Sequence, residues 1–300
     1  MNVQFRSLFF LLLATLISGC QLNLSVSAEE KQAENSATTI LVFSKTTGFR
    51  HNSIPDANAF LRQHALDNGW SLVATEDAAA FNDDNLANFD AVVFLLTTGD
   101  VLNDTQQAAF ERYIQAGGGY VGIHSASDTE YDWPWYGGLI GGYFNGHPRI
   151  QKASMDKDES PHPSTEFLPD RWELEDEWYN FSPNPADSSG IHVLLWLDET
   201  TYSGGTMGDS HPIAWAQEYD GGRAWYTGLG HRDALYTDEA YALFQQHVIA
   251  GIEWAAEDDP IVEPTPTQTP IPTITPTPNP TPISTPTSSS EFIFLPWLNK

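Results

Sequence analysis

Short apolar runs of strand type, separated by helical segments, constrain the fold of this chain most strongly. The first four runs lie at residues 39–43, 70–74, 91–96 and 120–123. Runs that are apolar throughout are typical of strands buried on both faces, and intervening helices of about ten to fifteen residues imply parallel pairing. The sequence therefore predicts an α/β fold with a doubly wound and mostly parallel sheet.

Three helices are predicted from stripes of apolar side chains and from helix-capping residues. A first helix carries Ile54, Ala57, Leu61 and Ala65 on one stripe, with Pro55 in its first turn. A second helix begins after a capping box and ends at the glycines of residues 117–119; a closing helix is predicted to be capped by Thr237. The box pairs Asn103 with Gln106, and the closing stripe comprises Tyr241, Phe244, Val248, Ile252 and Ala255.

The second half of the body has a weaker pattern. Residues 131–148 are rich in glycine and aromatic side chains and are predicted to form long loops. Later strand candidates are residues 191–197, 213–218 and 222–226. One domain is therefore predicted over residues 39–257.

The N-terminus is typical of an exported lipoprotein. Residues 1–19 combine Arg6, a short apolar run and a small-residue end, which predicts a signal peptide. Cys20 follows Leu16-Ile17-Ser18-Gly19 in a pattern that resembles a bacterial lipobox. The expectation is a protein lipid-anchored through Cys20 at the bacterial cell envelope, facing outward, with residues 20–38 as a flexible tether and no other membrane attachment.

The C-terminus changes composition. Residues 258–290 are rich in Thr-Pro repeats, which predicts a disordered, extended spacer. Residues 291–300 form a short apolar tail, interpreted either as a surface-retention tag or as a terminus that packs back on the domain.

Charge and cysteine count exclude several classes of function. The 300-residue chain has 13 Lys+Arg against 40 Asp+Glu, a formal charge of -27, so it lacks the basic surface that nucleic-acid binding needs. Cys20 is the only cysteine, which excludes a disulfide framework and a cysteine-ligated zinc site.

Histidines follow several of the predicted strands. In an open parallel sheet, loops converge beyond the carboxyl ends of the strands, and ligands bind there. His51, His124 and His231 stand in such loops, and the loop that contains His147 can reach the same rim. Histidine is a common metal ligand and acid/base group, so this convergence indicates a chemical site.

Five ordered motifs resemble those of the ThuA-like (trehalose utilisation) family, within the class I glutamine amidotransferase-like superfamily. They are Thr-Thr-Gly-Phe-Arg-His at 46–51, Gly-Gly-Gly-Tyr-Val-Gly-Ile-His-Ser-Ala at 117–126, Gly-His-Pro at 146–148, Glu-Asp-Glu-Trp-Tyr at 175–179 and Thr-Gly-Leu-Gly-His at 227–231. The resemblance implies a flavodoxin-like sheet and a link to sugar metabolism. It leaves the reaction open.

The turn after the fourth strand argues against glutamine hydrolysis. In amidotransferases a cysteine nucleophile occupies this turn, whereas here His124 stands at that place. The chain is therefore predicted not to be a glutamine amidotransferase. Ser125, one residue later, is a weaker nucleophile candidate with a neighbouring histidine as base.

Candidate catalytic residues are His124, His51, Glu177 and His231. Candidate metal ligands are His51, His124, His147 and His231, which would hold one divalent ion; the cofactor is otherwise unknown. Metal-free acid/base histidines, and histidines that merely tie loops together, stay open as alternatives. Candidate substrate-binding residues are Arg50, Trp133, Trp178, Tyr179 and Asp128, although such aromatic side chains also pack loop cores.

The leading hypothesis is a carbohydrate-active hydrolase- or lyase-type enzyme that acts on a sugar or an oxidised sugar derivative. A non-catalytic carbohydrate-binding surface module and a partner domain of a sugar dehydrogenase are the alternatives. The substrate, the reaction and the oligomeric state are not determined by the sequence.

Overall fold

The computed structural model describes residues 37–257. The predicted signal peptide, Cys20, the tether before residue 37, the spacer and the apolar tail lie outside the described residues. Within 37–257 no helix combines the length and the apolar character that a membrane crossing requires.

A nine-stranded sheet forms the centre of the fold, in the order β2-β1-β3-β4-β11-β10-β9-β6-β7. The first five strands are β1 (Thr39–Phe43), β2 (Ser71–Thr75), β3 (Ala91–Leu95), β4 (Gly119–Ile123) and β11 (Gly222–Thr227), and they pair in parallel. The other four are β10 (Pro212–Tyr219), β9 (Ile191–Asp198), β6 (Gln151–Lys157) and β7 (Arg171–Asp176), and they extend the sheet in antiparallel fashion. The predicted α/β class is confirmed, with an antiparallel half added to the parallel one.

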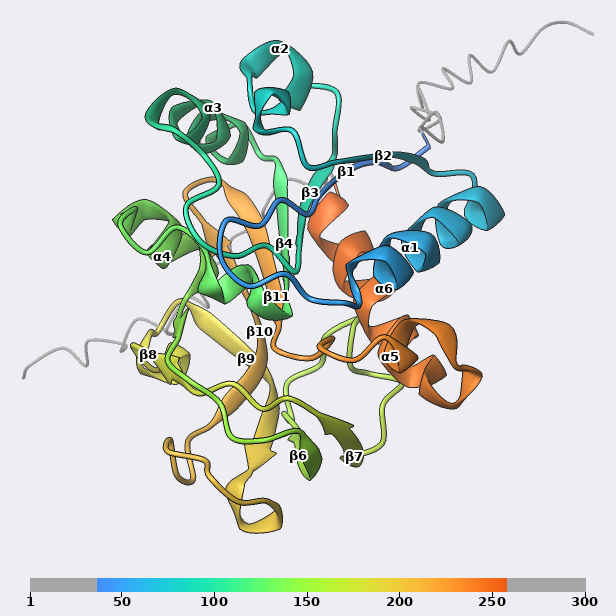
Figure 1. Ribbon diagram of the computed structural model, residues 1–300, viewed down its shortest axis with the longest axis vertical. Coiled ribbons are helices and arrows are strands. Elements are labelled where there is room, and N and C mark those ends of the chain that lie inside the picture. Colours follow the sequence, from blue (N-terminus) through green and yellow to red (C-terminus); the bar gives the residue numbers. More distant parts are fainter. Residues whose placement is uncertain (1–36, 258–300) are drawn as a thin grey trace, which may run out of the picture. The chain divides into compact units, whose positions relative to one another are not determined.

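The inner strands of the parallel half are largely buried on both faces, as predicted for β1, β3 and β4. Strand β2, at the edge of the sheet, is partly exposed, and the prediction of a doubly buried strand there is wrong. Every residue of β3 and β4 is buried. The helices are α1 (Ile54–Asn68), α2 (Asp83–Leu86), α3 (Asp104–Gln115), α4 (Pro134–Ile140), α5 (Ala234–Thr237) and α6 (Ala242–Ala256). Helices α1 and α6 lie on one side of the sheet, and α3 and α4 lie on the other (Figure 1).

Two of the three predicted helix starts are confirmed. Helix α1 buries Ile54, Ala57, Leu61 and Ala65, and has Pro55 in its first turn. The capping box before α3 is complete, because the side chains of its two residues bond each other's backbone. The predicted cap of the closing helix is wrong: Thr237 is the last residue of α5, and α6 starts at Ala242 after a short 3₁₀ turn capped by Asp238.

The region predicted as long loops contains regular structure. Residues 131–148 include α4 and the strand β5 (Tyr143–Phe144), which pairs with β8 (Phe181–Ser182). Strands β6 and β7 were not predicted from the sequence. They alternate polar and apolar side chains, and the burial pattern of β7, the last strand at one edge of the sheet, shows that it buries one face.

Candidate functional site

Three histidine-bearing loops converge at one edge of the parallel half. The loops follow β1, β4 and β11, which run in parallel and are close together in the sheet, so their carboxyl ends open at the same edge. His51 lies just before α1, His124 directly follows β4, and His231 lies four residues beyond β11. The predicted convergence of these three side chains is therefore found in the structure.

Glu177 reaches the same point from the opposite half of the sheet. It directly follows β7, yet its Oε2 lies 3.0 Å from His231 Nδ1 and 3.4 Å from His124 Nε2. One potential ligand atom from each of His51, His124, Glu177 and His231 lies within 4.8 Å of all the others. We call these four residues the histidine–glutamate cluster. Within residues 37–257 they are the one group of three or more such residues that meets this spacing.

The backbone at His124 is shaped as a sharp elbow. The chain leaves β4 at Ile123 and enters a 3₁₀ turn (His124–Asp128) with a φ of 51° at His124. Positive φ is uncommon for a residue with a side chain and costs about 1–3 kcal/mol. The His124 carbonyl accepts a hydrogen bond from the Tyr226 hydroxyl at 2.7 Å, which helps to hold the elbow.

The ring of His124 is oriented by the loop after β11. Its Nδ1 lies 2.8 Å from the carbonyl oxygen of Gly228. A carbonyl oxygen only accepts, so Nδ1–H donates, and Nε2 is the nitrogen directed at Glu177 and at His231 Nδ1, 3.3 Å away. A hydrogen bond from the second ring nitrogen to a carbonyl is the arrangement that metal-ligating histidines usually show.

His51 is held uncharged beside the other two rings. Its ring packs edge-on against those of His124 and His231, at centroid distances of 4.9 and 5.1 Å. Burial, followed by the proximity of His124 and His231, lowers the pKa of His51 to about 3. The Ser125 hydroxyl lies 3.3 Å from His51 Nδ1. At neutral pH the imidazole therefore keeps a free lone pair.

Glu177 and His231 each favour the charged form of the other. Burial alone would raise the pKa of Glu177, but hydrogen bonds from His124 and His231 outweigh it and hold that pKa well below its usual range. Burial opposes the charged form of His231, yet its contact with Glu177 raises the pKa of His231 above the ordinary value. The carboxylate is thus the anionic centre of the cluster.

Asp176 supports the cluster from behind and was not singled out by the sequence. It is fully buried, and its Oδ2 accepts a hydrogen bond from the Gly230 backbone nitrogen at 2.7 Å. Gly230 has a φ of 118°, a conformation that glycine tolerates, and it directly precedes His231. Asp176 thereby links the loop that carries His231 to the chain at Glu177. The acidic run 175–177 is the only sequence signal that pointed to it.

His147 lies at the mouth rather than in the cluster. Its Nδ1 is 3.1 Å from the second carboxylate oxygen of Glu177, Oε1, and its side chain is 39% exposed. Of the four predicted histidine ligands, three therefore meet around Glu177, while the fourth contacts that carboxylate from the solvent side.

Two of the predicted substrate-binding residues lie beside the cluster. The ring of Tyr179 packs on that of His124 at 4.2 Å between centroids, and it is buried, at 3% exposure, so it also offers no open face to a sugar. Asp128 is half-buried and accepts a hydrogen bond from the Tyr131 hydroxyl at 2.8 Å. Burial raises the pKa of Asp128, while Tyr131 and His124 partly oppose this.

The other three predicted substrate-binding residues are not gathered there. The Arg50 side chain is exposed and forms an ion pair with Glu76 at 2.7 Å. Trp133 and Trp178 are buried, and their indole nitrogens donate to Glu111 and to the Gln151 carbonyl. Buried rings leave no open face for a sugar, so the alternative that these aromatic side chains pack the core accounts for both tryptophans.

The cluster has the donors of a divalent metal site. Imidazole nitrogens with one carboxylate suit zinc, iron or manganese better than calcium or magnesium, which prefer oxygen ligands. Without a metal, the same groups form a histidine–carboxylate network able to move protons.

The protein is thus a mixed α/β domain with the histidine–glutamate cluster beyond the ends of its parallel strands. The family model described as ThuA, trehalose utilisation, matches residues 39–255. The chain therefore belongs to the ThuA family.

Solved structures share the fold. A ThuA-like protein from Bacteroides uniformis is 23% identical to this chain, with a TM-score of 0.62. The match covers 75% of this chain and 94% of the Bacteroides uniformis protein. A ThuA-like protein from Parabacteroides merdae is 21% identical to this chain, with a TM-score of 0.61. The match covers 76% of this chain and 92% of the Parabacteroides merdae protein. None of the curated proteins matches the chain.

Proposed function

We propose that this protein is an enzyme of carbohydrate metabolism that holds one divalent metal ion and acts on a sugar or an oxidised sugar derivative. The observation that carries the proposal is the gathering of four potential ligand atoms within 4.8 Å of one another in the histidine–glutamate cluster. The family description, trehalose utilisation, supports a sugar as the substrate class.

His124, His51 and His231 would supply imidazole ligands, and Glu177 a carboxylate. A bound metal supplies a Lewis acid, which polarises a sugar carbonyl or lowers the pKa of a water molecule. The φ of 51° at His124 and its bond to Gly228 fix the direction of one ligand before any metal binds. Preorganised ligands of this kind favour tight binding.

Two residues near the cluster are suited to handle protons or hydroxyls. His147 is partly exposed and touches Glu177, so it can exchange protons with solvent at the mouth. Asp128 is half-buried with a raised pKa, which favours a carboxyl group that donates or accepts a hydrogen bond to a sugar hydroxyl. Both are assigned to the substrate side of the site.

The proposal includes export and anchoring. Cys20 and the residues before it support a lipid-modified protein at the outer face of the cell envelope. Cys20→Ser should move the protein from the membrane fraction to the soluble exported fraction. Equal membrane retention of the variant would contradict the anchor.

The catalytic part is tested by metal removal and return. Purified protein is treated with a chelator and assayed by product chromatography on trehalose and on its keto derivative, before and after adding Zn²⁺, Mn²⁺ or Fe²⁺. Turnover should fall at least about 100-fold without metal and return with one of these ions. His64→Ala, which changes a histidine of α1 outside the cluster, should behave like the wild type.

One observation favours a metal-free alternative, namely the contact of Ser125 with His51. If chelation leaves turnover unchanged and Ser125→Ala abolishes it, nucleophilic catalysis by serine replaces the metal proposal.

A further inference from the structure

His211 is a buried histidine outside the histidine–glutamate cluster, directly before strand β10. Its side chain is fully buried, and both ring nitrogens have close partners. Nδ1 lies 2.7 Å from Oε1 of Glu199, and Nε2 lies 2.8 Å from the carbonyl oxygen of Tyr179. Glu199 opens a 3₁₀ turn (Glu199–Thr201) after β9, and its side chain is 16% exposed. The ring therefore joins the β9–β10 connection to the chain segment that follows β7.

Both contacts of His211 require a proton on the ring. A carbonyl oxygen only accepts, so Nε2 donates to Tyr179. Oε1 of Glu199 already accepts from the backbone nitrogen of Met207 at 2.8 Å, so it also faces Nδ1 as an acceptor. The Tyr202 hydroxyl, 3.3 Å from the same ring nitrogen, is a longer contact. A ring that donates from both nitrogens is an imidazolium, and Glu199 is its counter-ion.

Tyr179 connects this pair to the histidine–glutamate cluster. It stands two residues beyond Glu177 in the chain, and its ring packs on that of His124. Two residues of a chain span at most about 7 Å. A hydrogen bond to the Tyr179 carbonyl therefore restrains the backbone that carries the Glu177 carboxylate.

The loop of residues 203–210, which lies between Glu199 and His211 in the chain, is fastened to the same segment. The Thr206 nitrogen donates to Oδ1 of Asn180 at 2.9 Å. The Phe181 nitrogen lies 3.2 Å from Sδ of Met207. Because the Met207 nitrogen in turn donates to Glu199, the ion pair and the loop hold this segment together.

Asn180 passes the same restraint to the loop that carries His147. The Asn180 backbone exchanges hydrogen bonds with residues 145–146, at 2.7 and 2.9 Å. A Cβ atom added at Gly204 would lie only 2.7 Å from Pro148, so the 203–210 loop also touches the His147 loop directly. The position of His147 therefore depends on the loop that the ion pair holds.

We propose that Glu199 and His211 form a buried ion pair that positions Glu177, through Tyr179, and His147, through Asn180. Both are positioning residues, because neither belongs to the cluster. Buried ion pairs are often no more stabilising than apolar packing, so stability alone does not account for this one. The inference rests on the proposed function in taking Glu177 as a metal ligand, whereas the charge on His211 and the coupling to His147 need no metal.

The charge on His211 is tested in the wild type by nitrogen-15 NMR of histidine-labelled protein at pH 7, without added metal. Both ring nitrogens of His211 should carry a proton. His247, whose pKa burial lowers to about 4, should be neutral in the same spectrum and serves as the internal reference. A neutral His211 overturns the ion pair.

Two variants test the positioning. Glu199→Gln removes the charge, whereas Gly205→Ala keeps it but places a Cβ atom 2.3 Å from the Glu199 carboxylate carbon, which must then move. In each variant the ring signals of His147 should shift, those of His247 should not, and the affinity for Zn²⁺ should fall roughly three- to tenfold. Where one variant does not fold, the other decides.

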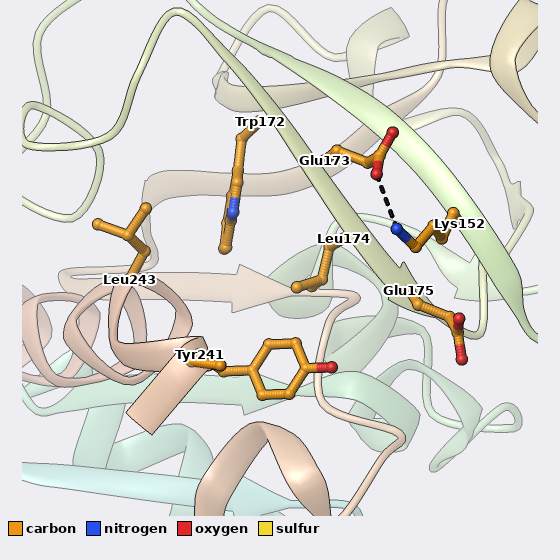
Figure 2. Close-up of a pocket in the computed structure, with 8 residues that line it drawn as sticks. Lys152, Trp172, Glu173, Leu174, Glu175, Tyr241 and Leu243 are labelled. Carbon is orange, nitrogen blue, oxygen red and sulfur yellow. Dashed lines mark hydrogen bonds and ion pairs between the residues drawn. The ribbon is translucent and has the colours of Figure 1, made fainter. Parts of the chain in front are cut away.

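Glu173→Gln is the matched control. It removes an exposed carboxylate of β7 that pairs with Lys152 at 3.1 Å, as Figure 2 shows, and it should match the wild type in every measurement.

The outcomes separate this inference from the proposed function. Unchanged His147 signals in the folded variants overturn the positioning role, even where the wild type binds metal. A lower melting temperature with unchanged His147 signals and metal affinity assigns the pair to stability alone and also overturns it. A wild type that binds no metal, yet shows a charged His211 and shifted His147 signals in the variants, supports the positioning and contradicts the metal proposal alone.

Discussion

Two groups of histidines lie on either side of the end of strand β11, and they differ in their partners. The histidine–glutamate cluster places three imidazoles around a carboxylate. The second group, which we call the histidine–serine cluster, comprises His162, His192 and His247 with Ser164. His247 Nε2 lies 3.3 Å from the Thr227 hydroxyl, and the next residue, Gly228, holds His124.

The histidine–serine cluster is built as packing. Its Ser164 hydroxyl lies 2.9 Å from His162 Nδ1, and the Ser164 carbonyl lies 2.8 Å from His247 Nδ1. Burial lowers the pKa of His247 to about 4; burial followed by the proximity of His192 and His247 lowers that of His162 to about 3. Among residues 37–257, neither His162 nor His247 forms an ion pair with a carboxylate.

The two groups each contain three histidines, and they differ in that only the histidine–glutamate cluster includes a carboxylate. Glu177 supplies a negative charge beside His124 and His231, which in the proposed function attracts a cation. In the histidine–serine cluster, His162 Nδ1 and both ring nitrogens of His247 contact neutral groups, whereas the Nε2 atoms of His162 and His192 are buried without a hydrogen-bond partner. The predictions below test this division.

The largest effect is expected for His124→Ala. Loss of the imidazole whose Nε2 faces Glu177 removes one ligand, so metal affinity should fall by more than about 100-fold while the protein stays folded. Metal titration with circular dichroism as the folding control measures both. Retention of metal by the folded variant would contradict its role as a ligand.

Glu177→Gln should reduce metal affinity by about 100-fold. The amide has nearly the same shape but lacks the charge that stabilises both the cation and His231. The effect is measured in the same metal titration. An affinity within about threefold of the wild type would remove the carboxylate from its central role in the comparison.

Asp176→Asn should have an intermediate effect, because Asp176 contacts the His231 loop and is not one of the proposed metal ligands. The asparagine oxygen can still accept from the Gly230 nitrogen, so thermal stability should stay close to that of the wild type. Removal of the charge behind the cluster should weaken metal binding about tenfold. A large loss of stability with unchanged metal affinity would show a purely structural role.

The smallest expected effect is on the pH dependence of stability, to which the histidine–serine cluster contributes. Unfolded histidine has a pKa near 6.5, whereas His247 in the fold has one of about 4. Its stabilising contribution is therefore complete above about pH 6.5 and is lost as pH falls toward 4, because the unfolded state then binds a proton that the folded state excludes.

For His247 the loss amounts to about 2 kcal/mol at pH 5. Urea unfolding at pH 7 and pH 5 should show a smaller pH dependence for His247→Gln than for the wild type, with metal content unchanged at pH 7. Identical pH dependence in both proteins would refute this assignment.

The parallel half and its three histidines were predictable for one reason. Continuous apolar runs identify doubly buried strands, and parallel topology brings the residues after those strands to one edge. His51 and His124 follow strands of this kind, and His231 follows β11, which was predicted from a weaker pattern and pairs in parallel with β4.

The other features of the fold and the site depend on tertiary contacts that the local sequence pattern does not encode. Strand β7 alternates exposed Glu173 with buried Leu174, and nothing in that pattern shows that its end folds back to bring Glu177 to His124. Glu177 was a candidate through the family motif. The burial of Trp133 and Trp178 likewise depends on tertiary packing, because an aromatic residue in a loop can face either core or solvent.

The most direct test of the central claim is the metal content of three proteins measured by elemental analysis after purification and equilibration with Zn²⁺, Mn²⁺ and Fe²⁺. The account predicts about one metal ion per chain in the wild type and in His247→Ala, and almost none in Glu177→Gln. A wild type that binds no metal, or an equal metal content in all three, would contradict it.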